Sequence, residues 1–580
     1  MVLKFIFELD SNSGVIEKIL IRVAKRLNIK LGLSRDLKYL YAYIESNEEG
    51  INNFSRELSR ELPLSIFLKS LNAEVVEEFK DDLQKDFPTI NLPPCPKCLS
   101  EAKNPQNENY YNPFHHCEVC GYKNGELRIE NGELKYKELF EKLADKLRSE
   151  GKIYIQTMNG KFEITTDLES AEQIVAVDLA AVATYFMSFE GDAKALGSIE
   201  KPLVNLKTNL NFKKEYGVSN PAYCVKLPDC MVLELLCEEI KNDIKLIGLK
   251  KSENSADFEF ELDNSDVIPV AVVCDTKNKD ILIQSGERGI LPKFEKYLNK
   301  DIEIGYGKFK AVCKENKTVL LQTNDKQESK TKLPYAGYFG VLNQWELEDK
   351  VTLGFALYKE NENKIMINSP KFGLVEYIDF DFKFHNFSEI FAAIKTMNET
   401  GEKLVNNFAT KQPQSFENAL SANFDTKKQG IAYLWGIIGI ILGLSDNIDE
   451  GYEKVIEYAN SAMTKKGVRI DYKMKNKNLD PLWAIRTAMS FKLAGVDNYL
   501  LSYGVLESFA EFLTNVYEEL NNESPLEGAV LVGDLFEGEF LNKTYTYIKK
   551  NHPVFTPKAL PLSGAIEAFG SAVLKVRMEG

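Results

Sequence analysis

The sequence predicts a multidomain protein of mixed α+β and α/β class, in which a small ferredoxin-like domain precedes a module with four cysteines. Three observations indicate this fold class. The chain has 580 residues, which is too many for one hydrophobic core. Strand and helix patterns alternate along its first part. Two Cys-x-x-Cys pairs come directly after that part.

The first domain is expected over residues 1–86. KFIFEL, KYLYAYIES and LKSLNAEVVEEF have the composition and alternation of strands. Residues 15–27 and 50–61 have the apolar spacing of amphipathic helices. The resulting order of strand, helix, strand, helix and strand is typical of a ferredoxin-like α/β sandwich.

The four cysteines form the most specific motif of the chain, within residues 90–125. CPKC and CEVCG are separated by 18 residues, and each pair can direct two thiolates toward one point. The spacing predicts a closed structural Zn²⁺ site with the ligands Cys95, Cys98, Cys117 and Cys120. Four ordinary buried cysteines are the alternative. The neighbouring His115 and His116 are interpreted as surface residues, and the other five cysteines as small apolar side chains.

The rest of the chain mixes strands and helices. A charged helix is expected over residues 136–148, followed by strands such as KIYIQT and VIPVAVVC. The polar segment 322–332 predicts a linker or a long surface loop. After it, AGYFGVL, VTLGFALYK and KIMINS indicate a β-rich region. Helices are then expected over 388–408 with Ser388 as N-cap, 430–444, 483–493 and 503–520, before a strand GAVLVGDL and a last helix from residue 563.

Composition excludes several classes of function. The formal net charge is −14, with 72 Lys and Arg against 86 Asp and Glu, which argues against nucleic acid or an acidic membrane as a general partner. The most apolar run has 15 residues, whereas a bilayer span needs about 20, so we expect a buried helix and no membrane span. The absence of a signal-peptide pattern and the odd number of cysteines predict a cytoplasmic location.

The order of a ferredoxin-like domain followed by CPKC and CEVCG resembles the start of the HypF family, the carbamoyltransferases of nickel-iron hydrogenase maturation. YYNPFHHCEVCGY is similar to an element of that family. The resemblance implies four domains. They are an acylphosphatase-like domain over 1–86, a four-cysteine zinc finger over 90–125, a YrdC-like domain over 126–325 and a C-terminal carbamoyltransferase-like domain of actin/HSP70 type over 333–580.

Two stretches resemble the nucleotide-binding regions of the family. GKIYIQTMNGKFEITTD keeps Gly160 and Asp167 of a YrdC-like motif, and Lys201 begins a match to the family's KPFAVM. In the last domain Glu450-Gly451 matches a conserved pair of the family pattern, and LVGDLFEGEFL keeps Gly533 but has Asp534 in place of a second glycine. The resemblance thus implies candidate nucleotide clefts at these residues, with ATP and Mg²⁺ as candidate cofactors beside Zn²⁺.

Other positions depart from the family. Glu17 and Lys18 stand where an acylphosphatase has its phosphate-binding Arg, and Ser34-Arg35 stand near its Asn, so we expect no acylphosphatase activity. Gly436 replaces a nucleotide-contacting Asp, Ser563 replaces a metal-binding Asp, and a second zinc finger and a histidine-rich metal motif are missing. No catalytic residue is therefore assigned, and the chain resembles a shortened and degenerate member.

Three functions remain in competition. The first is a HypF-like accessory protein of hydrogenase maturation or assembly, a zinc-containing scaffold with degenerate catalytic sites whose partners are maturation proteins such as HypE or hydrogenase subunits. The second is an active ATP-dependent carbamoyltransferase of cyanide-ligand synthesis that uses carbamoyl phosphate, with Mg²⁺ between Asp534 and a phosphate. The third is a zinc-ribbon adaptor unrelated to hydrogenases, because fold alone does not fix function.

Overall fold

The computed structural model of the protein describes all residues except 12, 37, 86, 88–90, 124, 126–134, 219, 260–270, 276–279, 287–292, 296–301, 315–316, 328–332, 361–362, 381, 383, 426–429, 476, 559 and 580. The chain forms two compact units. Unit 1 contains Met1–Asp275 and Gly286–Glu295, and unit 2 contains Thr276–Ser285 and Lys296–Gly580. Each unit is described by itself.

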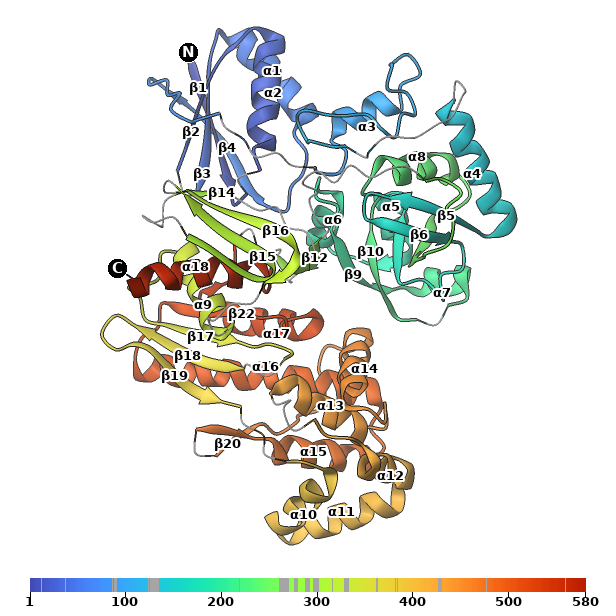
Figure 1. Ribbon diagram of the computed structural model, residues 1–580, viewed down its shortest axis with the longest axis vertical. Helices are drawn as coiled ribbons and strands as arrows, with labels where there is room; N and C mark the ends of the chain where they lie inside the picture. The colour runs from blue at the N-terminus through green and yellow to red at the C-terminus, as the bar shows by residue number, and fades with distance from the viewer. Residues whose placement is uncertain are drawn as a thin grey trace. The chain divides into compact units, whose positions relative to one another are not determined.

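Unit 1 begins with a four-stranded antiparallel sheet of order β2-β3-β1-β4, against which α1 and α2 pack (Figure 1). The elements are β1 (Val2–Leu9), α1 (Val15–Leu27), β2 (Lys30–Arg35), β3 (Tyr39–Glu45), α2 (Glu48–Glu61) and β4 (Leu68–Val76). The predicted ferredoxin-like sandwich is confirmed, but the strand β2 was not predicted. This short strand is recognisable only from its partners, since it pairs with β3 and the amides of Asp82 and Leu83 donate to the carbonyl of Leu33.

The second half of unit 1 is built on a mixed sheet of order β12-β9-β10-β7-β11-β6-β5, with β8 paired to β9. The helices are α3 (Pro96–Ala102), α4 (Tyr136–Glu150), α5 (Leu179–Tyr185), α6 (Glu190–Gly197), α7 (Leu210–Tyr216) and α8 (Met231–Ile240). The strands are β5 (Lys152–Thr157), β6 (Gly160–Thr165), β7 (Gln173–Ala176), β8 (Phe186–Met187), β9 (Leu203–Thr208), β10 (Ala222–Lys226), β11 (Leu246–Lys251) and β12 (Ala271–Asp275), and β14 (Lys293–Glu295) also lies in unit 1. The expected charged helix and KIYIQT strand are confirmed as α4 and β5.

Unit 2 is organised around a sheet of order β20-β21-β19-β18-β17-β22-β23. Its strands are β17 (Thr352–Ala356), β18 (Lys364–Ser369), β19 (Gly373–Asp379), β20 (Lys473–Lys475), β21 (Asn478–Asp480), β22 (Gly528–Val532) and β23 (Val554–Phe555). Outside this sheet lie β13 (Ile281–Gly286), most of which belongs to unit 2, and the hairpin of β15 (Ile302–Lys314) and β16 (Lys317–Gln327). Strands β17 and β22 are parallel, so their carboxyl ends lie side by side. In sheets of this kind ligands bind beyond the carboxyl ends of the strands.

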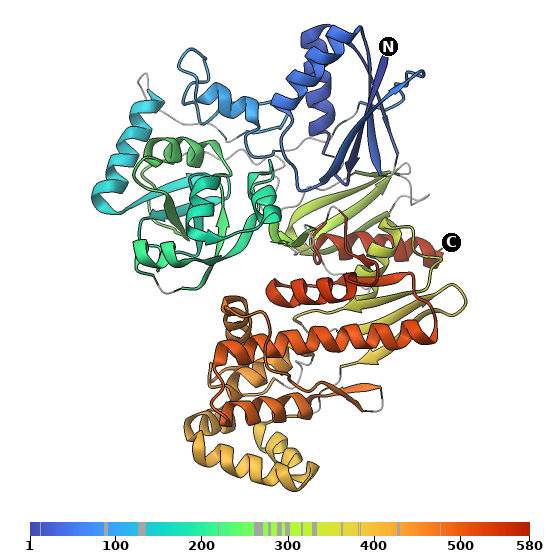
Figure 2. The same cartoon turned by 180° about the vertical axis from the view of Figure 1, so that it is seen from behind.

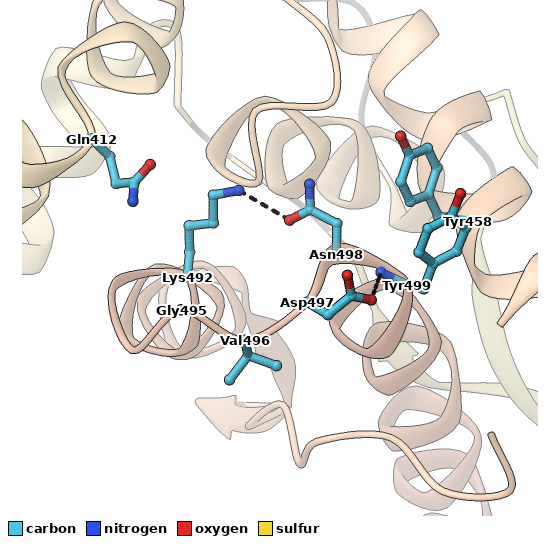
Figure 3. A pocket seen from close by; sticks show the side chains of 8 residues that line it. All are labelled: Gln412, Tyr458, Lys492, Gly495, Val496, Asp497, Asn498 and Tyr499. Atoms are coloured by element: carbon cyan, nitrogen blue, oxygen red, sulfur yellow. Dashed lines mark hydrogen bonds between the residues drawn. The ribbon is translucent and has the colours of Figure 1, made fainter. Parts of the chain in front are cut away.

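The helices of unit 2 form two groups. Around the sheet lie α9 (Leu333–Gln344), α16 (Asn498–Glu523), α17 (Gly538–Lys549) and α18 (Ala565–Glu579). A helical region contains α10 (Phe387–Met397), α11 (Glu399–Lys411), α12 (Pro413–Ser421), α13 (Ile431–Ile441), α14 (Ile448–Ser461) and α15 (Pro481–Leu493). Figure 2 shows α10, α11 and α12 gathered in gold at one end of this region. The turn between α15 and α16 lines a pocket (Figure 3).

Helix α13 confirms the interpretation of the apolar run. All 11 of its residues are buried, as the uncharged sequence predicts for a helix inside a core. Within the part of the chain that the structure describes, no helix is long and apolar enough to cross a membrane.

Three expectations about unit 2 were wrong. AGYFGVL lies inside α9, where Gly337 and Gly340 allow the helix to approach β22 and α18 closely. An apolar run without charges has no clear period, so packing decides its structure. Residues 322–327 of the expected linker belong to β16, because backbone pairing with β15 does not need apolar side chains; residues 328–332 lie outside the described residues. The helix expected over 388–408 is divided at Asn398, and its N-cap is Asn386, whose side chain accepts from the amide of Glu389 at 2.9 Å.

Candidate metal centre and nucleotide clefts

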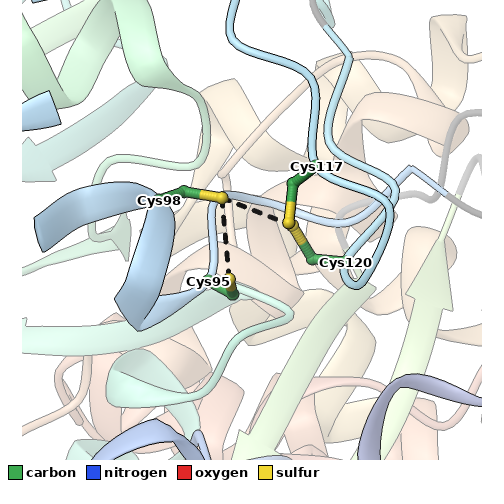
Figure 4. Close-up of side chains that lie close together, drawn as sticks. All are labelled: Cys95, Cys98, Cys117 and Cys120. Carbon is green, nitrogen blue, oxygen red and sulfur yellow. Dashed lines mark hydrogen bonds between the residues drawn. The ribbon is translucent and has the colours of Figure 1, made fainter. Parts of the chain in front are cut away.

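The four cysteines of the predicted zinc site lie together in unit 1 (Figure 4). All are buried, and their sulfur atoms lie within 4.8 Å of one another. The Sγ atoms of Cys95 and Cys98 are 3.6 Å apart, and those of Cys98 and Cys120 are 3.8 Å apart. Four sulfurs at about 2.3 Å from a tetrahedral zinc ion are about 3.8 Å apart, so the described geometry is compatible with Zn²⁺.

Local structure explains how the two knuckles form. Cys95 is the N-cap of α3, which places Cys98 in the first turn of that helix. The second knuckle closes with a hydrogen bond from the amide of Gly121 to the carbonyl of Cys117 at 2.8 Å, and Gly121 has a left-handed φ of 69°. This conformation favours glycine, as the sequence predicts. The ligands form a closed set without an open position, which is typical of a structural site.

One neighbour of the site differs from expectation. His116 is exposed as predicted, but the His115 side chain is only 14% exposed and lies 3.5 Å from a carboxylate oxygen of Glu101. A hydrogen bond with Cys117 raises the pKa of His115. The hydrogen bond with Cys120 contributes most to lowering the pKa of Cys117, which favours the thiolate form that a metal requires. His115 is therefore a partly buried neighbour of the ligand set rather than a surface residue.

The cysteine module is fixed to α8. Tyr122 is fully buried, its hydroxyl donates to the carbonyl of Pro113 at 3.3 Å, and it accepts from the amide of Met231 at 3.0 Å. Lys103 forms ion pairs with Glu238 at 3.1 Å and with Glu234 at 3.6 Å. A metal ion that stabilises this module would therefore also stabilise the contact between the module and α8.

The loop that resembles an acylphosphatase site is occupied by side chains of the protein. Arg35 donates to Glu17 at 2.7 Å and to the carbonyls of Leu9 and Ser11 at 3.2 and 2.9 Å. The Glu17 side chain is only 3% exposed. The guanidinium is thus bound to a buried carboxylate and to loop carbonyls, whereas a phosphate site needs a cation and amides directed at the ligand.

In the second sheet of unit 1, a buried polar cluster lies near the start of α8. The Nζ of Lys226 and the side-chain amide of Asn159 each lie 2.8 Å from the same carboxylate oxygen of Asp229. The other carboxylate oxygen of Asp229 is buried and has no hydrogen-bond partner among the described residues. Lys201 is largely buried, and desolvation lowers its pKa against the opposing charges of Glu234 and Asp229. These groups are rich in charge and could hold a polar ligand.

The predicted residues of this region do not all meet. Gly160 directly follows Asn159, so it lies at the end of β6 that faces the cluster. Asp167 follows the opposite end of β6 and is exposed. A strand of 6 residues is about 20 Å long, which separates Asp167 from Gly160. Sequence reasoning missed Lys226, Asp229 and Glu234, for which only the Lys-x-x-Asp spacing before a helix gave a weak signal.

In unit 2, a second cluster lies beyond the carboxyl ends of β17 and β22. A carboxylate oxygen of Asp534 accepts from the amide of Lys359 at 2.7 Å, and burial raises the pKa of Asp534. Glu537 accepts from the hydroxyl of Tyr452 at 2.5 Å and pairs with the Nζ of Lys359 at 2.9 Å. The amide of Gly533 donates to the carbonyl of Leu562 at 2.8 Å. Four parts of the chain therefore meet here.

A buried acid completes this cluster. Glu567 is fully buried in the first turn of α18, accepts from the hydroxyl of Tyr358 at 2.7 Å and also accepts from the amide of Gly564. Burial raises the pKa of Glu567 to about 7. Neither Glu567 nor Tyr452 was identified from the sequence. Glu567 lies in the family-like stretch PLSGAIEAFG that begins at residue 561, but only Ser563 of that stretch was assigned a role, and no motif contains Tyr452.

The Glu450-Gly451 pair, a predicted part of the nucleotide cleft, lies in the first turn of α14. Glu450 is exposed and accepts from the hydroxyl of Ser445 at 2.7 Å. Gly451 lies against Gly436 where α13 and α14 cross, and a Cβ on Gly436 would collide with the carbonyl of Ile448. The side chain of Asn447 caps α14, where it accepts from the amides of Asp449 and Glu450. The crossing leaves no room for the aspartate that the family pattern has at position 436.

Solved structures with this fold cover the whole chain, although no protein-family profile matches it. HypF in its phosphate- and nucleotide-bound form superposes with a TM-score of 0.66 and 14% identity, covering 100% of this chain and 99% of that one. HypF from T. kodakarensis gives a TM-score of 0.69 and 12% identity, again over 100% and 99% of the two chains. The chain thus has the full-length HypF fold, as its sequence resemblance predicts.

In sequence, the chain is similar to protein HydE of Wolinella succinogenes. The two are 24% identical over an alignment of 587 positions, which covers 97% of this chain and 99% of HydE.

Proposed function

We propose that the protein is a HypF-like accessory factor of nickel-iron hydrogenase maturation, which acts as a zinc-containing scaffold with degenerate catalytic sites. The HypF fold over the full chain and the end-to-end similarity to HydE support the maturation role. The observation that carries the scaffold role is the bond from the Lys359 amide to the Asp534 carboxylate.

The Asp534 contact argues against phosphate binding in the predicted nucleotide cleft of unit 2, the region around Asp534, Glu537 and Glu567. Loops that hold phosphate offer backbone amides to the ligand, and glycine allows the phosphate to approach them. Here the carboxylate of Asp534 takes up one such amide and adds negative charge, with the carboxyl groups of Glu537 and Glu567 nearby. The packing of Gly436 removes a further family position. The protein itself therefore occupies one of the amides that a phosphate would use and places acidic groups where a phosphate would bind.

A scaffold of this kind acts through protein partners. We propose maturation proteins such as HypE, or hydrogenase subunits, as partners in the cytoplasm, and Zn²⁺ at the four cysteines as the resident metal. The charge of −14 fits protein partners better than nucleic acid.

One observation favours an active enzyme as the second candidate. The buried Asp229 oxygen without a described partner, beside the largely buried Lys201, is a polar site that a ligand could complete. A carbamoyltransferase with a rearranged site would use this cluster rather than the one at Asp534. ATP and Mg²⁺ would then be its cofactors.

Calorimetric titration with ATP and Mg²⁺ separates the two candidates. The scaffold proposal expects no binding tighter than about 1 mM in the wild type. A dissociation constant below about 100 µM that is lost in Lys201→Met would overturn it and support the enzyme. Hydrogenase activity of a strain deleted for this protein tests the maturation role separately. That activity should fall, and Lys201→Met should restore it if catalysis is not needed.

A further inference from the structure

A pocket of about 350 Å³ lies in the helical region of unit 2 (Figure 3). Its walls come from the junction of α11 and α12, from α14, and from the turn between α15 and α16. None of its lining residues belongs to the positions that resemble a nucleotide site. The pocket is lined by one cation, two side-chain amides and a pair of tyrosines, together with Gly495, Val496 and Asp497.

The cation is Lys492, at the end of α15. Its Nζ donates to the side-chain oxygen of Asn498 at 3.0 Å, and it forms no ion pair with an acid in the described ranges. Desolvation lowers the pKa of the Lys492 ammonium, opposed only by the charge of Asp497. The Asp497 carboxylate is already used as the cap of α16, where it accepts from the amides of Tyr499 and Leu500. A partly desolvated ammonium without a paired carboxylate favours an anion from outside.

Two amide side chains add hydrogen-bond donors. The oxygen of Asn498 accepts from Lys492, which leaves its NH₂ group to donate. Gln412 lies across the pocket from Lys492, as Figure 3 shows, and its side chain has no hydrogen bond to any residue that the structure describes. A carboxylate has two oxygens that accept in several directions, so it matches this arrangement of donors.

The tyrosines provide a flat apolar surface. The rings of Tyr458 and Tyr499 are stacked, with centroids 4.5 Å apart and planes at 24°. Tyr499 is 40% exposed. Aromatic rings favour offset stacking, so a further planar group can stack on the exposed side of this pair.

We propose that this pocket binds a small molecule that carries a carboxylate on a planar, aromatic or conjugated group. Lys492 pairs with the carboxylate, Asn498 and Gln412 donate to it, and the planar group stacks on Tyr499. Cations near helix ends often only complement the helix dipole. That role explains a lysine at the end of α15. It does not explain why the Lys492 ammonium donates to the side chain of Asn498, or why the side-chain amide of Gln412 has no described partner.

Binding of four probes to the full chain tests the proposal, with saturation-transfer NMR and calorimetry as readouts. Benzoate has the carboxylate and the ring, acetate has only the carboxylate, benzamide has only the ring, and inorganic phosphate is a general anion. Benzoate should bind with a dissociation constant of about 1 mM or less, and each other probe at least about tenfold more weakly. Equal binding of benzoate and benzamide, phosphate binding as tight as benzoate, or no benzoate binding would overturn the proposal.

Variants locate the site. Lys492→Met should weaken benzoate at least about tenfold and leave benzamide unchanged, whereas Tyr499→Ala should weaken benzoate but not acetate. Lys403→Met, which removes an exposed lysine of α11, is the matched control and should change nothing. Circular dichroism and thermal unfolding verify that each variant is folded, and Lys492→Gln provides a milder second variant. If benzoate binds Lys492→Met and Lys492→Gln as well as the wild type, the pocket is not its site.

Discussion

The cysteine module of unit 1 and the cleft of unit 2 both lie where the sequence resembles a ligand-binding motif, but they differ in what their functional groups contact. In the module, four sulfurs converge at the separation of zinc ligands. In the cleft, Asp534 and Glu567 accept from the protein's own amides and hydroxyls. A motif recognisable in sequence can therefore direct its side chains toward one common point or toward the rest of the protein, and the motif alone does not decide between the two arrangements.

Loss of a cysteine ligand in the module is expected to have the largest effect on zinc content and stability. Cys95→Ser should reduce the zinc content from about one ion per chain to near none and should unfold the surrounding module, because structural zinc contributes on the order of 10 kcal/mol of binding energy. Metal analysis by mass spectrometry and limited proteolysis within residues 91–123 measure both results.

Cys224→Ser is the control for this loss, since Cys224 lies on β10 outside the cluster. It should keep its zinc and its resistance to protease. Freshly purified wild-type protein without zinc would show that the cysteines only pack together, and the contrast between the two regions would disappear.

The second-largest loss of stability is expected at the crossing of α13 and α14. Gly436→Asp restores the family residue, but its side chain collides with α14 and buries a charge, so it should lower the free energy of unfolding by about 4 kcal/mol or more. Urea unfolding followed by circular dichroism measures this change.

Gly197→Ala is the matched control, because a Cβ there makes ordinary contacts of 3.5 and 3.6 Å. Its effect should stay within about 1 kcal/mol. A Gly436→Asp variant as stable as the wild type that also gains ATP binding would mean that the cleft is only one substitution away from a working nucleotide site.

The buried acid of the cleft predicts a dependence of stability on pH. Burial raises the pKa of Glu567 to about 7 from an ordinary value of 4.5. Between these pH values the folded protein keeps a proton that the unfolded chain releases, so the free energy of unfolding falls as pH rises through this window and is level above it. The full shift corresponds to about 3 kcal/mol.

Urea unfolding between pH 5 and pH 8 tests this sign for the wild type and Glu567→Gln. The variant should lose the part of the decline that Glu567 causes, while Glu450→Gln, at an exposed site, should keep it. Burial also raises the pKa of Asp192 to about 6 and raises the pKa values of Glu200, Glu234 and Asp534, so a decline of the same sign remains in the variant. A wild-type stability that rises across this range would contradict a neutral buried Glu567.

The cysteine module and the cleft also differ in how well the sequence predicts them. The helix over residues 15–27 and the strand KIMINS follow from local periodicity, and the cysteine spacing identifies its own site. The helical state of AGYFGVL depends on the contacts of Gly337 and Gly340 with distant elements, which no local pattern contains. The cleft residues Tyr452 and Glu567 come from different helices, and only the fold brings each of them near Asp534. Sequence therefore predicts sites whose ligands are close in the chain better than sites assembled by packing.

The smallest effect is expected from Asp534→Gly, which restores the second glycine of the family pattern. The variant frees the amide of Lys359 and removes a negative charge, so two of the obstacles to a phosphate are absent. It also loses a hydrogen bond to a carboxylate, which costs about 1 to 3 kcal/mol of stability. Calorimetry with ATP and Mg²⁺ should detect at most weak binding, with a dissociation constant in the range of about 1 to 10 mM, because Glu537, Glu567 and the glycine crossing at Gly436 still oppose a nucleotide.

Asp534→Asn is the control for this variant, because it keeps an acceptor for the Lys359 amide, and it should bind no ATP. If Asp534→Gly instead binds ATP with a dissociation constant near 10 µM, Asp534 alone prevents nucleotide binding, and the proposed degeneracy of this region comes from one side chain.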